Sequence, residues 1–213
     1  KRLYLGYETT ESSDIQNQNS PNINDYKNYF ITSNYELIEY KSDDNLFPIK
    51  TNIFGKIGFG SRESQSITSN QFFANINLEH NLYLNQRNIF NIRSQNYFLQ
   101  SQEYLINELY RFGGLYSIQG FKEDSLQGNL FTSILTEYRY VVTPTLYLNT
   151  IIDYGYYQDK STNSQGNLYS LGTGLGLLTK NGLFKLIYAA GSSNNQSLDI
   201  KNAIVHVSFK TNF

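Results

Sequence analysis

Apolar and polar residues alternate with a period of two along most of this chain. Within residues 203–213, Val205 and Val207 fall on one side of an extended backbone, and His206 and Ser208 fall on the other. Successive side chains of a β-strand point to opposite faces, whereas a helix requires a period of 3.6. The alternation also occurs, with varying clarity, in residues 2–9, 28–41, 49–60, 70–84, 87–99, 129–142, 145–157, 169–177 and 182–190. The pattern predicts an all-β fold of about ten strands.

The lengths of these segments favour strands that cross a membrane. They run to roughly 9–14 residues, the length needed to cross a bilayer at a tilt, whereas strands of soluble proteins average about 5–6 residues. Short turns are expected at 42–45, 85–87, 143–145 and 179–182, and longer polar loops at 10–27, 63–69, 102–128, 158–166 and 191–200. Because the two kinds of connection alternate, we predict an antiparallel transmembrane β-barrel with periplasmic turns and extracellular loops.

Composition narrows the class of protein further. Lys and Arg number 17 against 18 Asp and Glu, so the chain lacks the basic surface of a nucleic-acid binder. No apolar stretch approaches the roughly 18 residues of a helical membrane span. Mean hydropathy is −0.46, which a barrel tolerates because its polar interior offsets its lipid face. A soluble β-sandwich is the alternative fold.

A glycine-rich motif lies in the longest predicted loop, 102–128. The stretch "FGGLYSIQGF" supplies Gly113, Gly114, Ile118, Gln119, Gly120 and Phe121, and five predicted strands and the terminal Phe213 follow it. Three further stretches occur in order: "FKEDSL" at 121–126, "TEYRYVV" at 136–142 with Glu137, and "IIDYGYY" at 151–157 with Asp153 and Gly155. We expect the two adjacent glycines to form a sharp turn with positive φ.

This ordered set of motifs resembles the BamA/TamA family of outer-membrane assembly and translocation proteins. In that family a long loop before the fifth-last strand carries Gly-Gly, a spacer and then Val/Ile-Arg-Gly-Phe/Tyr. The resemblance implies a 16-stranded barrel preceded by periplasmic POTRA domains. Residues 1–213 would be the C-terminal ten strands, and six strands and the POTRA domains would lie outside this chain. It further implies that loop 102–128 folds into the lumen, where the family's arginine contacts acidic residues on the next two strands.

The position of that arginine is occupied here by Gln119, which carries no charge. The alternation places Glu137 and Asp153 on the inward face, so both carboxylates need a partner. We expect Arg139 to replace part of the missing charge, because it shares the inward face with Glu137. Arg93 and Lys122 are further candidates. Gln119 can also be read as a mark of relaxed function in a divergent member.

We expect no enzymatic activity, no cofactor and no metal site. Glu137 and Asp153 are interpreted as a structural network of the lumen rather than an acid–base pair. His80 and His206 have no partners at ligand spacing, and the chain has no cysteine. The alternation also places three glycines of one strand inward, where we expect them to leave room for the loop; they are Gly172, Gly174 and Gly176.

The predicted function is insertion or export of client proteins in the bacterial cell outer membrane, through a lateral seam at the final strand. That strand, 201–213, carries Phe209 and Phe213 as a C-terminal signal. Expected partners are outer-membrane lipid and lipopolysaccharide, client outer-membrane or secreted proteins, and accessory lipoproteins or other subunits. A small passive pore or a surface-binding barrel is the alternative, and a barrel protease or lipase lacks a credible catalytic set.

Overall fold

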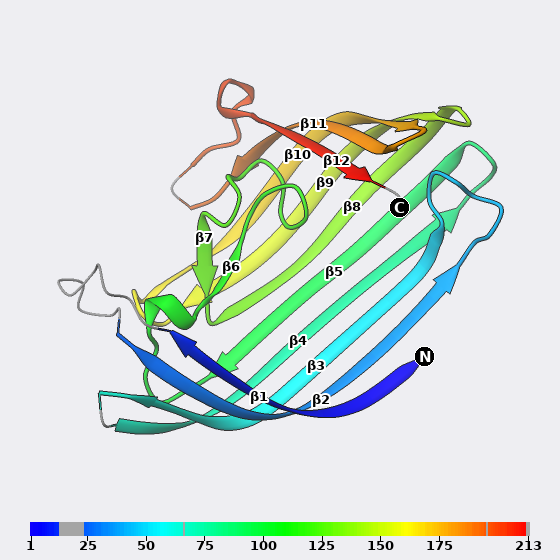
Figure 1. Ribbon diagram of the computed structural model, residues 1–213. Coiled ribbons are helices and arrows are strands. Elements are labelled where there is room, and N and C mark those ends of the chain that lie inside the picture. The colour runs from blue at the N-terminus through cyan, green and yellow to red at the C-terminus, as the bar shows by residue number, and fades with distance from the viewer. Residues whose placement is uncertain (13–23, 66, 195, 212–213) are drawn as a thin grey trace.

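Ten long strands form one antiparallel sheet in the computed structural model, which describes residues 1–12, 24–65, 67–194 and 196–211 (Figure 1). The strands are β1 (Arg2–Ser12), β2 (Tyr26–Tyr40), β3 (Ile49–Ser64), β4 (Ile67–Tyr83), β5 (Asn88–Gln100), β8 (Leu130–Thr143), β9 (Leu146–Asp159), β10 (Ser164–Thr179), β11 (Gly182–Ser192) and β12 (Ile204–Thr211). They coincide with the ten alternating segments, so the strand prediction is confirmed.

The remaining elements are small. A two-stranded ribbon of β6 (Tyr110–Phe112) and β7 (Leu126–Gly128) lies between β5 and β8, and the 3-10 turns are η1 (Ile106–Glu108) and η2 (Ile200–Asn202). No helix in the described ranges is long and apolar enough to cross a membrane.

The sheet curls into an open trough with β1 at one edge and β12 at the other (Figure 1). No ladder joins β1 to β12 in the part of the chain that the structure describes, so these ten strands form an open sheet and not a barrel closed by themselves. Unpaired backbone groups in hydrocarbon cost several kcal/mol each. Closure in lipid would therefore pair these edges with each other or with further strands.

The two faces of the sheet have inverted polarity compared with a soluble protein. Large apolar side chains are exposed on the convex face, among them Leu5, Ile31, Phe59, Ile76, Ile134, Ile152, Leu171 and Val207. Polar and charged side chains are buried on the concave face, among them Asn91, Glu137, Arg139, Asp153 and His206. An apolar exterior around a polar interior is the arrangement that a lipid solvent stabilises. Among the described residues no second sheet packs on the convex face, so a sandwich is not formed.

Two connections differ from their prediction. The connection expected at 63–69 is much shorter, because β3 continues to Ser64 and β4 begins at Ile67. The turn expected at 42–45 is instead a longer segment, 41–48, and the simple alternation of short turns and long loops is wrong at these two places. The two segments differ in the hydrophobicity of their residues. The ends of β3 and β4 are polar and extend as a hairpin, whereas segment 41–48 contains apolar residues that become buried.

Segment 41–48 folds inward at one end of the trough. Asp44 Oδ1 accepts the backbone N–H groups of Leu46 and Phe47 at 3.0 and 2.9 Å, which fixes the turn. Leu46 and Phe47 then pack with Ile89 and Tyr147 in a buried cluster. The segment therefore covers part of the concave face rather than only linking two strands.

Candidate functional site: the lumen loop and its anchors

The connection between β5 and β8, residues 101–129, is seated on the concave face of the sheet and is called the lumen loop below (Figure 1). Its range agrees within one residue at each end with the expected 102–128. Its buried apolar residues are Leu105, Leu109, Phe112, Leu115, Ile118 and Phe121. Four of them pack with sheet residues Phe131, Leu135, Ile151, Leu168, Ile187 and Ala189. Each buried side chain of this size contributes about 1.5–3 kcal/mol, so apolar contacts hold most of the loop in place.

Aromatic stacking orients the ribbon of β6 and β7 within the lumen loop. The ring centroids of Phe112 and Phe131 are 4.0 Å apart, and those of Tyr97 and Tyr110 are 4.7 Å apart. Burial raises the pKa of the Tyr110 hydroxyl, which stays neutral. Stacked rings add to the burial energy and fix their relative geometry. The ribbon therefore sets the angle at which the rest of the loop enters the trough.

The tip of the lumen loop depends on glycines with positive φ. Gly113 and Gly114 have φ values of 105° and 100°, which agrees with the expected sharp turn. The Gly114 N–H donates to Ile118 O at 3.1 Å and closes this turn. Gly120 has a φ of 76° and lies against the backbone of Ala190. Only glycine combines this backbone conformation with so close an approach.

Other glycines of the wall have a different role from the expected one. A Cβ on Gly172, Gly174 or Gly176 would meet atoms of β9 and β11, including the Tyr147 ring beside Gly176, rather than the lumen loop. The expectation that these three glycines accommodate the loop is therefore wrong. Gly155 and Gly191 accommodate it instead, because a Cβ there would meet Ile118 and Gly120 respectively. Sequence alternation places a glycine inward but does not say which neighbour uses the space.

Polar contacts of the tip reach strands β9 and β12. The Gln119 N–H donates to Asp153 Oδ2 at 3.2 Å, and the Gly120 N–H donates to His206 Nε2 at 3.2 Å. The Tyr116 hydroxyl lies 2.7 Å from Ser208 Oγ. The tip thus bonds to the edge strand β12 at two points, which the sequence reasoning did not foresee although alternation places both β12 residues inward.

The side chain of Gln119 does not contact Glu137 or Asp153. Its Nε2 donates to Leu115 O within the loop at 3.2 Å, and its Oε1 has no hydrogen-bond partner among the described residues. A neutral amide is not drawn to a carboxylate as a guanidinium is, and here it bonds locally. The expectation that this side chain faces the two carboxylates is wrong, because the backbone makes the contact with Asp153.

Arg139 and Glu137 pair with each other and with the wall rather than with the lumen loop. Arg139 Nη2 lies 2.5 Å from Glu137 Oε2, and Asn149 Nδ2 donates to the other carboxylate oxygen at 2.5 Å. The Arg139 guanidinium also lies 4.5 Å from the Phe47 ring centroid, where a cation–π contact is favourable. The two residues therefore neutralise each other, which agrees with the expectation that Arg139 supplies a positive charge beside Glu137. The expectation that both are partners of the loop is wrong, and of Glu137, Asp153 and Arg139 it is Asp153 that hydrogen-bonds to the loop. Of the other candidates, Arg93 reaches Tyr116 O at 3.5 Å.

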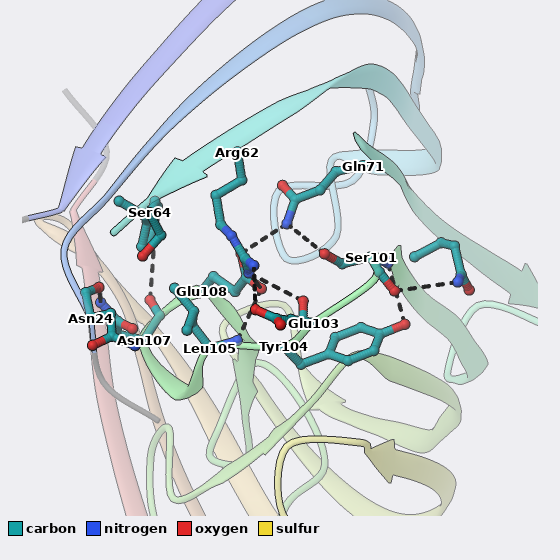
Figure 2. Close-up of polar contacts among 12 residues, drawn as sticks. Asn24, Arg62, Ser64, Gln71, Ser101, Glu103, Tyr104, Leu105, Asn107 and Glu108 are labelled. Atoms are coloured by element: carbon teal, nitrogen blue, oxygen red, sulfur yellow. Dashed lines mark hydrogen bonds and ion pairs between the residues drawn. The ribbon is translucent and has the colours of Figure 1, made fainter. Parts of the chain in front are cut away.

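A second anchor, absent from the sequence prediction, holds the first half of the lumen loop (Figure 2). Arg62 of β3 donates to Glu108 Oε1 at 2.6 Å, and both side chains are 2% exposed. Gln71 of β4 donates to Glu108 Oε2 at 2.9 Å and to Ser101 Oγ at 3.2 Å. Glu108 Oε1 also accepts the Leu105 N–H at 3.0 Å.

In this anchor the positive charge is on the wall and the negative charge is on the loop. A buried charge without a partner is strongly destabilising, so the pair binds the loop to β3 firmly once both residues are buried. We missed Arg62 because the predicted strand ended at residue 60. Extending the alternation two residues further would have placed Arg62 inward.

Introducing an arginine at position 119 tests the role of Asp153, which is 2% exposed and has hydrogen bonds but no ion pair in the described part of the chain. We expect Gln119→Arg to form a favourable interaction with Asp153 worth about 0.5–3 kcal/mol of coupling energy. The measurement is a double-mutant cycle with Asp153→Asn, in which thermal unfolding in detergent gives the stability of each protein. Additive effects would show that the loop does not use this contact.

The geometry defines a class of protein: a curled antiparallel sheet with an apolar exterior and a long connection seated on its inner face. No family model and no curated protein sequence matches the chain. Its fold is similar to the solved structure of CdiB from Acinetobacter baumannii, with a TM-score of 0.62, 14% sequence identity and 87% of this chain covered. The chain spans about one third of the length of CdiB, since 33% of that chain is covered. At this identity the similarity establishes the fold alone.

Proposed function

We propose that the chain forms part of an outer-membrane protein translocation barrel of the BamA/TamA type. The observation that supports this most is the seating of the lumen loop, which is held on the inner face of the sheet by buried contacts at both ends. A sheet that only has to span the membrane does not need a long connection packed inside it. The proposed location is the bacterial outer membrane, with lipid and lipopolysaccharide around the convex face and no catalytic role.

The proposed route for clients is the edge at β12. Its outer backbone groups have no strand partner in the described residues, and such an edge accepts an added strand by β-augmentation. Phe209 is 51% exposed on the convex face, where a lipid-facing residue of this strand is expected. Phe213 lies outside the described residues. Client outer-membrane or secreted proteins, accessory lipoproteins and other subunits are the proposed partners.

A passive pore is the second candidate function, and the lumen loop argues against it. A pore requires an open path, whereas the loop places Phe112, Leu115 and Ile118 in buried clusters on the inner face. Surface binding remains compatible with the fold but gains no support from a particular contact. A translocation barrel is expected to insert a purified client into a membrane, whereas a passive pore or a surface-binding barrel is not.

We expect a tether between the loop tip and β12 to stop client insertion. Residues 1–213 contain no cysteine. Tyr116→Cys with Ser208→Cys, in full-length protein from which any other cysteine has been removed, therefore provides two defined attachment points for a short bis-maleimide. If clients add at the β12 edge, β12 has to shift relative to the loop tip, and the tether prevents this shift. The measurement is folding of a radiolabelled client in liposomes that contain the full-length protein.

The control is each single cysteine variant treated with the same reagent, which should insert the client as the parent does. Two results would contradict the proposal. The first is that liposomes with the untreated protein fold no more client than liposomes without protein. The second is that the tethered protein retains full activity.

A further inference from the structure

A cavity of about 300 Å³ lies beneath the tip of the lumen loop. Tyr116 of the loop bounds it, and Leu46 and Phe47 of segment 41–48 bound it from another side. The rest of the lining comes from segment 41–48 and from seven strands, and its polar and charged residues on the strands are Glu79, Asn81, Arg93, Arg139, Lys185, Ser208 and Lys210. This volume is at the lower end of the range for small-ligand sites.

The cavity carries an excess of positive charge. Arg139 is neutralised by Glu137, at 2.5 Å. Among the other lining residues, Arg93, Lys185 and Lys210 are cations and Glu79 is the single carboxylate, which leaves two positive charges. Neither Lys185 nor Lys210 forms an ion pair within the described ranges, and the one hydrogen bond of the Arg93 guanidinium is the 3.5 Å contact with Tyr116 O. Arg93 and Lys185 are partly buried and Lys210 is exposed to solvent, and cations that line a partly enclosed site attract an anion.

The arrangement of donors is also suited to a multiply charged oxyanion. Lys185 is directly opposite Ser208 in the ladder of β11 and β12, and Lys210 is opposite Leu183, the next inward position along β11. Arg93 is on β5, so the cationic groups approach the cavity from different strands. Arginine and lysine together are the usual ligands of phosphate oxygens.

We propose that this cavity binds a phosphate group. A phosphate dianion matches the two uncompensated charges, whereas a carboxylate would neutralise one of them. Inorganic phosphate and a phosphomonoester headgroup of a lipid present the same dianionic group to the site, whereas a phosphodiester headgroup presents the same oxygens with one charge. The proposal concerns ligand binding alone and does not depend on translocation of clients, so the two can fail separately.

The test uses the full-length protein purified in detergent and phosphate-free buffer. Inorganic phosphate is titrated by calorimetry, and an organic extract of the same preparation is analysed for phospholipid by mass spectrometry. Heat-dependent mobility on gels confirms that each variant is folded. We expect binding of titrated phosphate, or a retained phospholipid, and about a tenfold loss of either for each cation removed in Arg93→Gln and Lys185→Gln.

The matched control is Lys180→Gln, which removes the same charge from an exposed position in the turn between β10 and β11. It should bind as the parent does. Retained phospholipid alone would assign the site to a lipid headgroup, and titrated phosphate alone would assign it to the free ion. The proposal is overturned if the folded parent binds neither, or if both cavity variants bind as tightly as Lys180→Gln.

Discussion

Glu108→Gln is expected to lower the free energy of unfolding by about 3–5 kcal/mol, because it leaves the Arg62 guanidinium buried without its countercharge. The nearest other carboxylate, Glu103, lies 3.9 Å away and its side chain is 65% exposed, so it cannot provide an equivalent pair. The loss should be accompanied by release of the first half of the lumen loop. Denaturant unfolding of the full-length protein in detergent measures the first effect, and limited proteolysis measures the second.

The control for this substitution is the same change in an exposed ion pair. Glu11 lies 3.1 Å from Lys27, with side chains 65% and 52% exposed, and Glu11→Gln should cost no more than about 1 kcal/mol. Replacing Arg62 and Glu108 together by methionine should cost less than Glu108→Gln alone, because no buried charge then remains. Equal losses for Glu108→Gln and Glu11→Gln would show that the buried pair of Arg62 and Glu108 does not anchor the loop.

Gly120→Ala is expected to unseat the tip of the lumen loop at a cost of about 2–4 kcal/mol. The φ of 76° disfavours any side chain, and the added Cβ would lie 2.5 Å from the Ala190 carbonyl carbon and the Gly191 nitrogen. These are backbone atoms, which cannot rotate away as a flexible side chain can. The contacts of the neighbouring Gln119 and Gly120 N–H groups with Asp153 and His206 should be lost together.

Gly55→Ala is the matched control for the glycine. A Cβ there has no atom within 4 Å, so this change should be neutral or slightly stabilising. The measurement is the unfolding free energy of both variants, with amide exchange of residues 113–121 as a local readout. If Gly120→Ala exchanges as slowly as Gly55→Ala, the tip does not need the close approach to β11.

Local patterns accounted for the strands and for the turn at Gly113 and Gly114, because both depend on neighbouring residues. A period of two fixes which residues face inward, and Glu137 and Asp153 are inward as expected. Which residues pair across the lumen cannot be predicted from this period. Arg62 and Glu108 are 46 residues apart, and no local period links a wall position to a loop position.

The errors at the tip have a common physical origin. The resemblance directed attention to the side chain at position 119, whereas the backbone N–H of Gln119 makes the contact with Asp153. A backbone contact leaves no trace in residue identity, because every residue except proline has the donor. Segment 41–48 was missed for a related reason: its short polar stretch predicted a turn, and the burial of Leu46 and Phe47 depends on distant strands.

The central claim is that the lumen loop is a folded part of the wall and not a mobile surface loop. Amide hydrogen exchange of the loop in the full-length protein tests this claim most directly. Hydrogen bonds engage the N–H groups of Gly114, Leu115, Ser117, Gln119 and Gly120. We expect peptide 113–121 to exchange slowly, as strand β9 does. Complete exchange of that peptide within seconds, while β9 stays protected, would contradict it.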